Sequence, residues 1–495
     1  MTWPLWVLAA LGVAVVVVAA YDLTQRHHAI LRNFPVIGHL RYLLEAMGPE
    51  LRQYIVTDND ADKPFSRDQR RWVYASAKGQ DTRFGFGTDN DLEHGAPYII
   101  VKQSSFPVDA PVGPDDELAM TKVLGGPRRR ARAVRMPSVV NVSGMSFGSL
   151  GAKAVESLNR GAALAGCWQS TGEGGITPHH DHGGALVWQI GTGYFGCRDD
   201  RGRFDLARFT DVVAAHPAVR AVEIKLSQGA KPGLGGLLPG AKVTPEIAAL
   251  RGVPVGVDCV SPARHSAFSD ADSLLDFVEL LATESGLPVG VKSAVGDTTL
   301  FTELARLMAS GERGLDFLTV DGGEGGTGAA PLVFADHVAL PFKIGFARVY
   351  REFAEAGATD RLVFLGSGKL GVPEEALLAF ALGCDGVNVG REAMLAIGCI
   401  QAQRCHTGRC PTGVATQSPW RQRGLDPTLK SVRCATYVAG LRHELRRLAR
   451  ACGVDHPARV TLDHLEVLDG SYGSRPARAV FDYAPGWGTP SEDRS

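Results

Sequence analysis

The stretch RLVFLGSGKLGVPEEALLAFALGCDGVNVGREA, residues 361–393, contains the unit that decides the fold. Two short apolar runs, each followed by a polar or glycine-rich loop, flank a segment whose apolar residues recur at helical spacing behind Pro373. Proline is favoured in the first turn of a helix, where its missing N–H is not needed. We therefore predict the order strand, loop, helix, strand, loop, at 362–365, 366–371, 373–382, 386–389 and 390–393.

The same alternation extends over most of the chain after residue 137. Further strands are predicted at 139–143, 221–225, 255–260, 289–292 and 317–320. Helical spacing recurs at 272–284 and 298–310. Alternation over this length predicts an α/β fold with a parallel sheet, either open or closed as a (β/α)8 TIM barrel.

Polar loops at the carboxyl ends of the predicted strands favour the closed barrel. These loops are at 143–148, 225–231, 292–294, 321–328, 366–371 and 390–393. Active sites of such barrels gather on this face. Glycine loops at helix starts can hold phosphate through their backbone amides, and Arg391 adds a cation to the last loop. The late loops therefore predict a phosphate cradle for a phosphorylated cofactor.

The composition argues against nucleic acid as a partner and against a secreted fold held by disulfides. The 495 residues carry 52 Lys and Arg against 53 Asp and Glu, a net charge of -1, so no general positive field would hold nucleic acid. The chain has nine cysteines, an odd number, and three of them lie within a dozen residues. This pattern argues against a secreted disulfide framework and favours metal or redox use of the cluster.

The N-terminal stretch 3–20, WPLWVLAALGVAVVVVAA, is uncharged and long enough to cross a bilayer as a helix. We favour a single membrane anchor over a cleaved signal peptide, because no basic residue precedes the apolar run. Basic residues follow it, which predicts a catalytic body on the cytoplasmic side: Arg26, His27, His28, Arg32 and Arg41. The arginine run at 128–132 is interpreted as a solvated face.

Cys399, Cys405 and Cys410 place three thiols at two close, unequal intervals, and Pro411 follows the last as in many bacterial ferredoxin runs. Three ligands fit a [3Fe-4S] cluster. Tetrahedral zinc would need a fourth ligand, for which His406 is the nearest candidate. Buried thiols without a metal are a third interpretation.

The region from about 139 to 417 resembles the FMN-binding synthase domain of glutamate synthase, in a shorter, glutamate-synthase-like form. The resemblance is carried by GMSFGS at 144–149, STGEGG at 170–175, KLSQGAKPG at 225–233, LPGAKVTPEIA at 238–248, GGTGAAP at 325–331 and GCIQAQRCHTGRCPTGVATQ at 398–417. It implies a (β/α)8 barrel, FMN, a [3Fe-4S] cluster and reductive formation of L-glutamate from 2-oxoglutarate and ammonia.

The same resemblance implies roles for individual residues. Lys231 and Arg251 correspond to a cationic clamp for the carboxylates of 2-oxoglutarate, with Gln228 beside them, and two cations suit a dicarboxylate. Glu173 corresponds to the carboxylate at the ammonia entry point. Lys292 would hold negative charge near the flavin. The residues expected to bind FMN are Ser143, Met145, Ser146, Lys292, Gly366, Gly368, Gly390 and Arg391.

Three departures from the family pattern affect substrate and partners. The chain begins with a membrane-type segment instead of a glutaminase domain, so ammonia would come from solution or a partner glutaminase. Leu237 replaces a family glutamine, and VDGGE at 320–324 differs from the family before GGTG. The β-helical carboxy-terminal domain of full-length enzymes is missing.

Without a convincing GxGxxG fingerprint, ferredoxin or a reductase subunit is expected to donate electrons, which pass through the cluster and FMN to an imine of 2-oxoglutarate. Two alternatives stay open: transfer of an amine to another oxo acid, and a membrane-tethered electron carrier. The expected organisation is a transmembrane helix at 3–20, a linker and cap at 21–136, a barrel with the cysteine loop at 137–425, and a helical extension and tail at 426–495.

Overall fold

The computed structural model describes residues 3–25, 27–83, 85–92, 98–109 and 118–489. The chain divides into two compact units, Met1–Arg70 and Arg71–Ser495. Arg26, one of the basic residues behind the predicted orientation, lies outside the described residues, as do parts of the predicted 21–136 and 426–495 regions.

The first unit is helical. Its elements are α1 (Trp3–Thr24), α2 (Ala29–Asn33), α3 (Gly38–Leu51) and the π-helical turn η1 (Arg52–Val56). The helix α1 is long and apolar enough to cross a membrane, a property that signal sequences share, and its apolar stretch is not buried within the protein.

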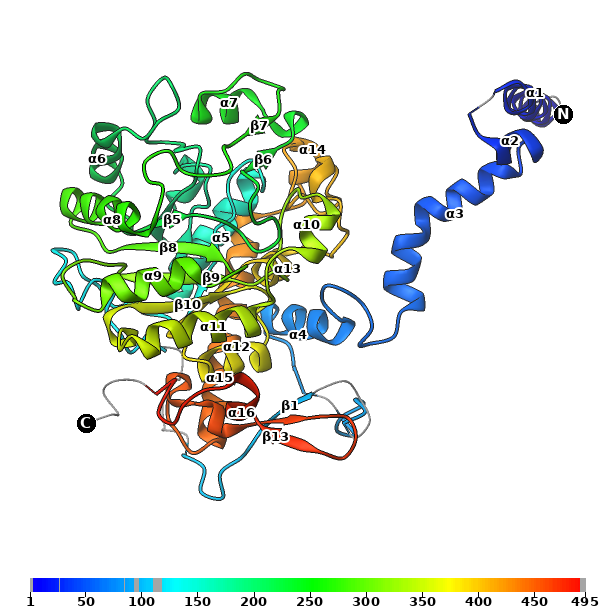
Figure 1. Ribbon diagram of the computed structural model, residues 1–495. Coiled ribbons are helices and arrows are strands. Elements are labelled where there is room, and N and C mark those ends of the chain that lie inside the picture. Colours follow the sequence, from blue (N-terminus) through cyan, green and yellow to red (C-terminus); the bar gives the residue numbers. More distant parts are fainter. Residues whose placement is uncertain (1–2, 26, 84, 93–97, 110–117, 490–495) are drawn as a thin grey trace. The chain divides into compact units, whose positions relative to one another are not determined.

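The second unit is built on a closed barrel of eight parallel strands, which confirms the predicted fold (Figure 1). Sequence neighbours are also neighbours in the barrel, and β11 closes it against β2. The barrel strands are β2 (Val140–Val142), β3 (Trp168–Ser170), β4 (Ala185–Ile190), β5 (Val219–Lys225), β8 (Val289–Ala294), β9 (Phe317–Asp321), β10 (Val363–Ser367) and β11 (Gly386–Val389).

The predictions of the barrel strands are correct except at three places. The sequence indicated no strand at β3 or β4. The predicted strand at 255–260 is wrong as a barrel strand, because only β7 (Cys259–Val260) forms there and it pairs antiparallel with β6 (Leu237–Leu238). Val255 and Val257 are exposed, so their alternation with polar residues does not mark a strand with a buried face.

Helices accompany the barrel strands in the second unit, and the first of them, α4, begins at the end of the first unit. They are α4 (Arg67–Ala77), α5 (Ala152–Ala165), α6 (Leu206–Ala215), α7 (Pro245–Arg251), α8 (Ala271–Ser285), α9 (Thr299–Met308), α10 (Leu332–His337), α11 (Phe342–Glu355), α12 (Pro373–Ala381), α13 (Arg391–Ile397), α14 (Pro419–Gln422), α15 (Pro427–Ala451) and α16 (Ala477–Phe481). The long α15 packs on α5 at Gly161, where an added Cβ would lie 2.5 Å from the Cβ of Cys434. This glycine lets the two helices approach closely.

A small antiparallel sheet joins distant parts of the chain. β1 (Tyr98–Val101) pairs with β12 (Leu465–Leu468), and β12 pairs with β13 (Ser474–Pro476). The predicted cap region and the predicted tail therefore share one sheet.

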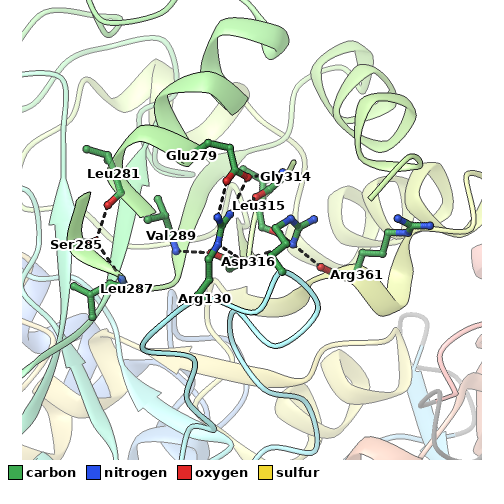
Figure 2. A network of polar contacts seen from close by, with 11 residues as sticks. Arg130, Glu279, Leu281, Ser285, Leu287, Val289, Gly314, Leu315, Asp316 and Arg361 are labelled. Carbon is green, nitrogen blue, oxygen red and sulfur yellow. Dashed lines mark hydrogen bonds and ion pairs between the residues drawn. The ribbon is translucent and has the colours of Figure 1, made fainter. Parts of the chain in front are cut away.

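The arginine run at 128–132 is not a uniformly solvated face, which corrects its interpretation. Arg130 donates to Glu279 and Asp316, with N···O distances of 2.5 and 3.0 Å (Figure 2). Arg128 donates to the carbonyl oxygens of Leu315 and Arg361. These contacts lie at the amino-terminal ends of β8, β9 and β10, so the two arginines fasten a loop to the end of the barrel opposite the predicted site.

Candidate active site

The carboxyl end of β5 carries the central ion pair of the site. Nζ of Lys225 lies 2.8 Å from Oε1 of Glu173, in the loop after β3, and 3.0 Å from Oε1 of Gln228. The side-chain amide of Gln228 donates to the carbonyl of Gly326, at 2.9 Å. These contacts link the loops that follow β3, β5 and β9.

Glu173 is held as a carboxylate by its cations. Burial alone would raise its pKa, but the charges of Lys225, Lys231 and Arg251 outweigh burial and hold the pKa of Glu173 below its usual value. Its oxygens lie against Gly191 and Gly236, where an added Cβ would come within 2.6 and 2.9 Å of them. The carboxylate is therefore fixed in position as well as in charge.

Lys231 and Arg251, predicted as a clamp for the substrate carboxylates, both act through their charge on the carboxylate of Glu173. Lys231 is buried, and within the described residues its ammonium has no hydrogen-bond partner. Burial lowers the pKa of Lys231, and Glu173 offsets part of that effect. Arg251, at the end of α7, donates to the carbonyl of Phe147 at 2.9 Å and lies over the ring of Phe195.

The backbone of Lys225 is positioned by a buried histidine. The two nitrogens of the His265 ring lie 2.9 Å from the carbonyl oxygen of Lys225 and 3.0 Å from the hydroxyl of Tyr194. Because a carbonyl only accepts, Nε2 carries the proton and Nδ1 accepts from the hydroxyl. Backbone amides of Ser266 and Ala267 donate to that same hydroxyl. Burial lowers the pKa of His265 to about 4, so the ring is neutral.

Lys292 lies inside the barrel mouth on β8, beside β5 in the sheet. Its Nζ is 3.4 Å from Oδ2 of Asp321, at the end of β9. Burial works against its charge, yet Asp321, Glu223 and Glu173 together raise the pKa of Lys292 above its usual value. Lys292 is thus a buried, permanent cation.

Glycines let the loops around the mouth approach one another. Gly172 has a left-handed φ of 68°, and an added Cβ would lie 2.4 Å from the amide nitrogen of Ser146, next to Met145. An added Cβ at Gly368 would lie 3.0 Å from the amide of Gly322, and one at Gly390 would face Ser143 at 3.6 Å.

The late loops also hold Arg391, whose guanidinium donates to the carbonyl of Glu324. Gly366 differs from the other predicted cofactor glycines, because its missing Cβ would meet Leu370, Phe342 and Cys384 in the wall of the barrel.

The residues around the mouth fit FMN in chemistry. Ser170, at the end of β3, has a buried hydroxyl with no hydrogen-bond partner. It lines a cavity of about 10 Å³ inside the barrel, together with Asn141, Glu223 and Asn388, and this cavity is too small for a flavin. The buried cation Lys292, the guanidinium of Arg391 and the close glycine loops at the mouth suit the ring and the phosphate of FMN.

The cysteine loop follows α13. Burial raises the pKa of Cys399 to about 12, whereas at Cys410 nearby backbone amides outweigh burial and lower the pKa. Nζ of the buried Lys242 donates to the carbonyl oxygens of Ser149 and Cys405. In the described part of the chain, no three Cys, His, Asp or Glu side chains are close enough together to hold one metal ion. His406, considered for zinc, is exposed.

Sequence reasoning missed four residues of this arrangement: Lys225, Asp321, Tyr194 and His265. Lys225 ends a predicted strand and Asp321 directly follows one, and that position is the signal that could have found them. Tyr194 and His265 lie in loops without a recognisable pattern. Their roles depend on contacts that only the fold creates.

Comparisons with known proteins identify the family of the chain. The family model for the conserved region in glutamate synthase matches residues 119–455. A glutamate synthase large subunit-like protein of Bacillus subtilis is 36% identical over 484 residues, 90% of each chain. An archaeal glutamate synthase (NADPH) of Methanocaldococcus jannaschii is 35% identical over 328 residues. That match covers 65% of this chain and 60% of the archaeal protein, so the chain spans less than two thirds of that relative.

A third relative, a glutamate synthase large subunit-like protein of Rhizobium meliloti, is 31% identical over 68% of this chain and 76% of its own. Among solved structures, one of mandelate oxidase aligns with 81% of this chain and 91% of the oxidase chain, at 16% sequence identity and with a TM-score of 0.42. That likeness is too distant to bear on function. The family match and the first relative are sufficient: the chain belongs to the glutamate synthase family of oxidoreductases.

Proposed function

We propose that the protein forms L-glutamate by reductive amination of 2-oxoglutarate with ammonia, using FMN. The observation that carries this proposal is the cluster at the carboxyl end of β5, where one ionised carboxylate, Glu173, is surrounded by Lys225, Lys231 and Arg251. The cluster holds three cations and one anion, so its excess positive charge suits a dicarboxylate substrate.

Lys231 is the residue best prepared to bind a substrate carboxylate. Its ammonium is buried and, among the described residues, has no hydrogen-bond partner; the charge of Glu173 offsets only part of the cost of burial, which an arriving anion would lower further. Arg251 already donates to the carbonyl of Phe147 and to Sγ of Cys259, so it contributes its remaining donors and its charge. Two cations at different positions could hold the two ends of 2-oxoglutarate.

Glu173 would orient ammonia. A carboxylate is a hydrogen-bond acceptor only, and it attracts ammonium as well as ammonia. Because its pKa is held below the usual value, Glu173 stays ionised at neutral pH. Lys225 and the neighbouring glycines keep it in one place, so it can present the nitrogen to a bound oxo group.

FMN would lie at the mouth, held by Ser143, Met145, Ser146, Lys292, Gly368, Gly390 and Arg391, with Gly366 in the supporting strand. Bound there, FMN supplies hydride transfer. Lys292 would keep a positive charge beside the ring, and Arg391 with the late glycine loops would take the phosphate.

We also propose a [3Fe-4S] cluster on Cys399, Cys405 and Cys410. Its support is the three thiols on one loop, the lowered pKa of Cys410 and the buried cation Lys242 beside them. The thiols would have to draw together around iron, since they form no metal-holding group by themselves. Cys405→Ser should remove the iron signal in electron paramagnetic resonance, and an unchanged signal would refute this ligand set.

Membrane attachment through α1 is proposed on the length and apolar surface of that helix, with the catalytic body on the cytoplasmic side. Electrons would come from ferredoxin or a reductase subunit. Ammonia would come from solution or from a partner glutaminase.

One anaerobic experiment tests the reaction. The flavin of the purified protein is reduced, 2-oxoglutarate and ammonium are added separately and together, and flavin reoxidation and glutamate are measured. We expect reoxidation with L-glutamate only when both are present. If the reduced flavin persists with both substrates, the proposed reaction is wrong.

Leu237 motivates the alternative that another oxo acid is the substrate. It lies partly exposed on β6, in the hairpin with β7. A panel of oxo acids in the same experiment separates the alternatives: faster reoxidation by another acid would favour the related amine-transfer reaction. If no oxo acid reoxidises the flavin, the alternative that stays is a membrane-tethered electron carrier.

A further inference from the structure

The helix α3 presents an apolar stripe that the described residues leave exposed. Leu40, Leu43, Leu44 and Met47 recur at i, i+3, i+4 and i+7, and all four are about half exposed. This spacing places them on one side of the helix. The other side is polar and carries an exposed ion pair between Arg41 and Glu45, at 2.8 Å.

The start of α3 is fastened to the carboxyl end of α1. Asp22 is fully buried, and its carboxylate accepts hydrogen bonds from Nε2 of His39 at 2.9 Å and from the amide of Val36 at 2.8 Å. The side chain of Gln25 donates to the carbonyl oxygens of Asp22 and His28, the residue before α2. The direction of α3 relative to α1 is thus set by buried polar contacts.

The two helices do not continue in one direction. Figure 1 shows α1 end-on while α3 runs across the view. An apolar helix that crosses a bilayer and an amphipathic helix that turns away at its end are the two parts of an anchor that spans the membrane and then lies on it.

We propose that α3 lies in the headgroup region of the same bilayer that α1 enters, with Leu40, Leu43, Leu44 and Met47 facing the acyl chains. The proposal rests on the membrane attachment proposed above. The bilayer is preferred to a second copy of the chain as the occupant because the stripe is continuous with the membrane helix and is fastened to its end. Phe34 and Ile37, also exposed, extend the apolar surface between the two helices.

Site-specific photocrosslinking tests the proposal on the full-length chain in vesicles of phosphatidylethanolamine and phosphatidylglycerol. Leu43→benzoylphenylalanine places the reactive group on the apolar stripe, and Glu45→benzoylphenylalanine is the matched control. The control lies two residues away on the nearly opposite side of the helix, and both positions are exposed. We expect several-fold more lipid adduct at position 43 than at position 45, measured by peptide mass spectrometry.

Equal lipid labelling at the two positions would overturn the proposal, and so would protein adducts at position 43, whether to a second copy or to the same chain. Flotation of the vesicles and resistance to alkaline carbonate test α1 separately. Protein that floats without lipid adducts at 43 refutes only the placement of α3, whereas protein that does not float refutes membrane attachment as well.

A second measurement covers the case in which the bulky probe disturbs the helix. Amides 38–51 should exchange hydrogen more slowly in vesicles, and Leu43→Glu should speed their exchange several-fold. Arg41→Gln changes the net charge by the same one unit on the polar side and should not. Equal effects of the two variants would contradict the proposal.

Discussion

At the scale of single residues, the site depends on charges that are buried and specifically arranged. Lys231→Met removes one ammonium and keeps most of the side-chain volume. Because a hydrogen bond to a charged group contributes about 1.5–3 kcal/mol, 2-oxoglutarate should bind about 10- to 100-fold more weakly. Titration of flavin reoxidation against 2-oxoglutarate measures this loss. FMN content should be unchanged, and Lys102→Met, an exposed site paired with Glu466, is the control.

His265 should make the stability of the second unit depend on pH. Its pKa is lowered by burial to about 4 in the folded state, from about 6.5 in the unfolded chain. Between these values the unfolded state binds the extra proton, so the contribution is full above pH 6.5 and is lost as pH falls toward 4. It amounts to about 3 kcal/mol.

His265→Gln separates this titration from the hydrogen bonds, because glutamine can donate to the Lys225 carbonyl and accept from Tyr194 but does not titrate. The variant should lose less free energy of unfolding than the wild type between pH 6.5 and 4, as measured by urea denaturation. Parallel curves for the two proteins would show that His265 is not the group responsible.

At the scale of elements, two glycines with nearly the same φ allow two effects of a glycine-to-alanine substitution to be told apart. One effect is backbone strain, and the other is the loss of a close contact between loops. Gly172 and Gly166 have φ values of 68° and 62°. An added Cβ at Gly166 meets nothing within 4 Å, whereas at Gly172 it would collide with the backbone of Ser146. Gly166→Ala should cost about 1–2 kcal/mol of stability and leave FMN binding unchanged.

Gly172→Ala carries the same strain and also pushes apart the loops after β2 and β3. We expect it to weaken FMN binding at least several-fold, measured by flavin fluorescence on refilling the deflavinated protein. Similar FMN affinities of the two alanine variants would mean that the contact between these loops does not shape the cofactor site.

The sequence was most informative for elements with strong local signals. The strand, glycine loop and proline-started helix at 363–381 were predicted almost as they occur. β3 (Trp168–Ser170) was missed because its sequence, WQS, has one apolar residue followed by two polar ones and so shows no apolar run. Val255 and Val257, near β7, were assigned to a strand because apolar and polar residues alternate there with the two-residue period of a strand. That period is the same whether the apolar residues are buried or exposed, and these two are exposed.

At the scale of the whole molecule, the contacts that the sequence could not predict are those between distant residues. Arg130 and its partner Asp316 are 186 positions apart, and Lys225 and Glu173 are 52 apart. In the sequence, the arginine run at 128–132 has the pattern of a solvated face, because its ion-pair partners lie far away along the chain and become neighbours only in the fold. The motifs identified which residue types matter, but only barrel closure shows that Lys225 holds Glu173 in place.

The division into two units leads to a prediction for the molecule as a whole. Each unit packs within itself, and the barrel network of Lys225, Glu173 and Lys292 lies entirely in the second unit. A chain that lacks residues 1–24 should therefore keep its thermal transition and its FMN content.

The same truncated chain should no longer resist alkaline carbonate, because the apolar helix that crosses the bilayer is gone. Binding through α3 alone would be weak and reversible, since an interfacial helix buries far less apolar surface than a spanning one. Flotation before and after a carbonate wash measures both effects. A lowered transition temperature would show that the first unit stabilises the barrel, and attachment that survives carbonate would show that α1 is not the anchor.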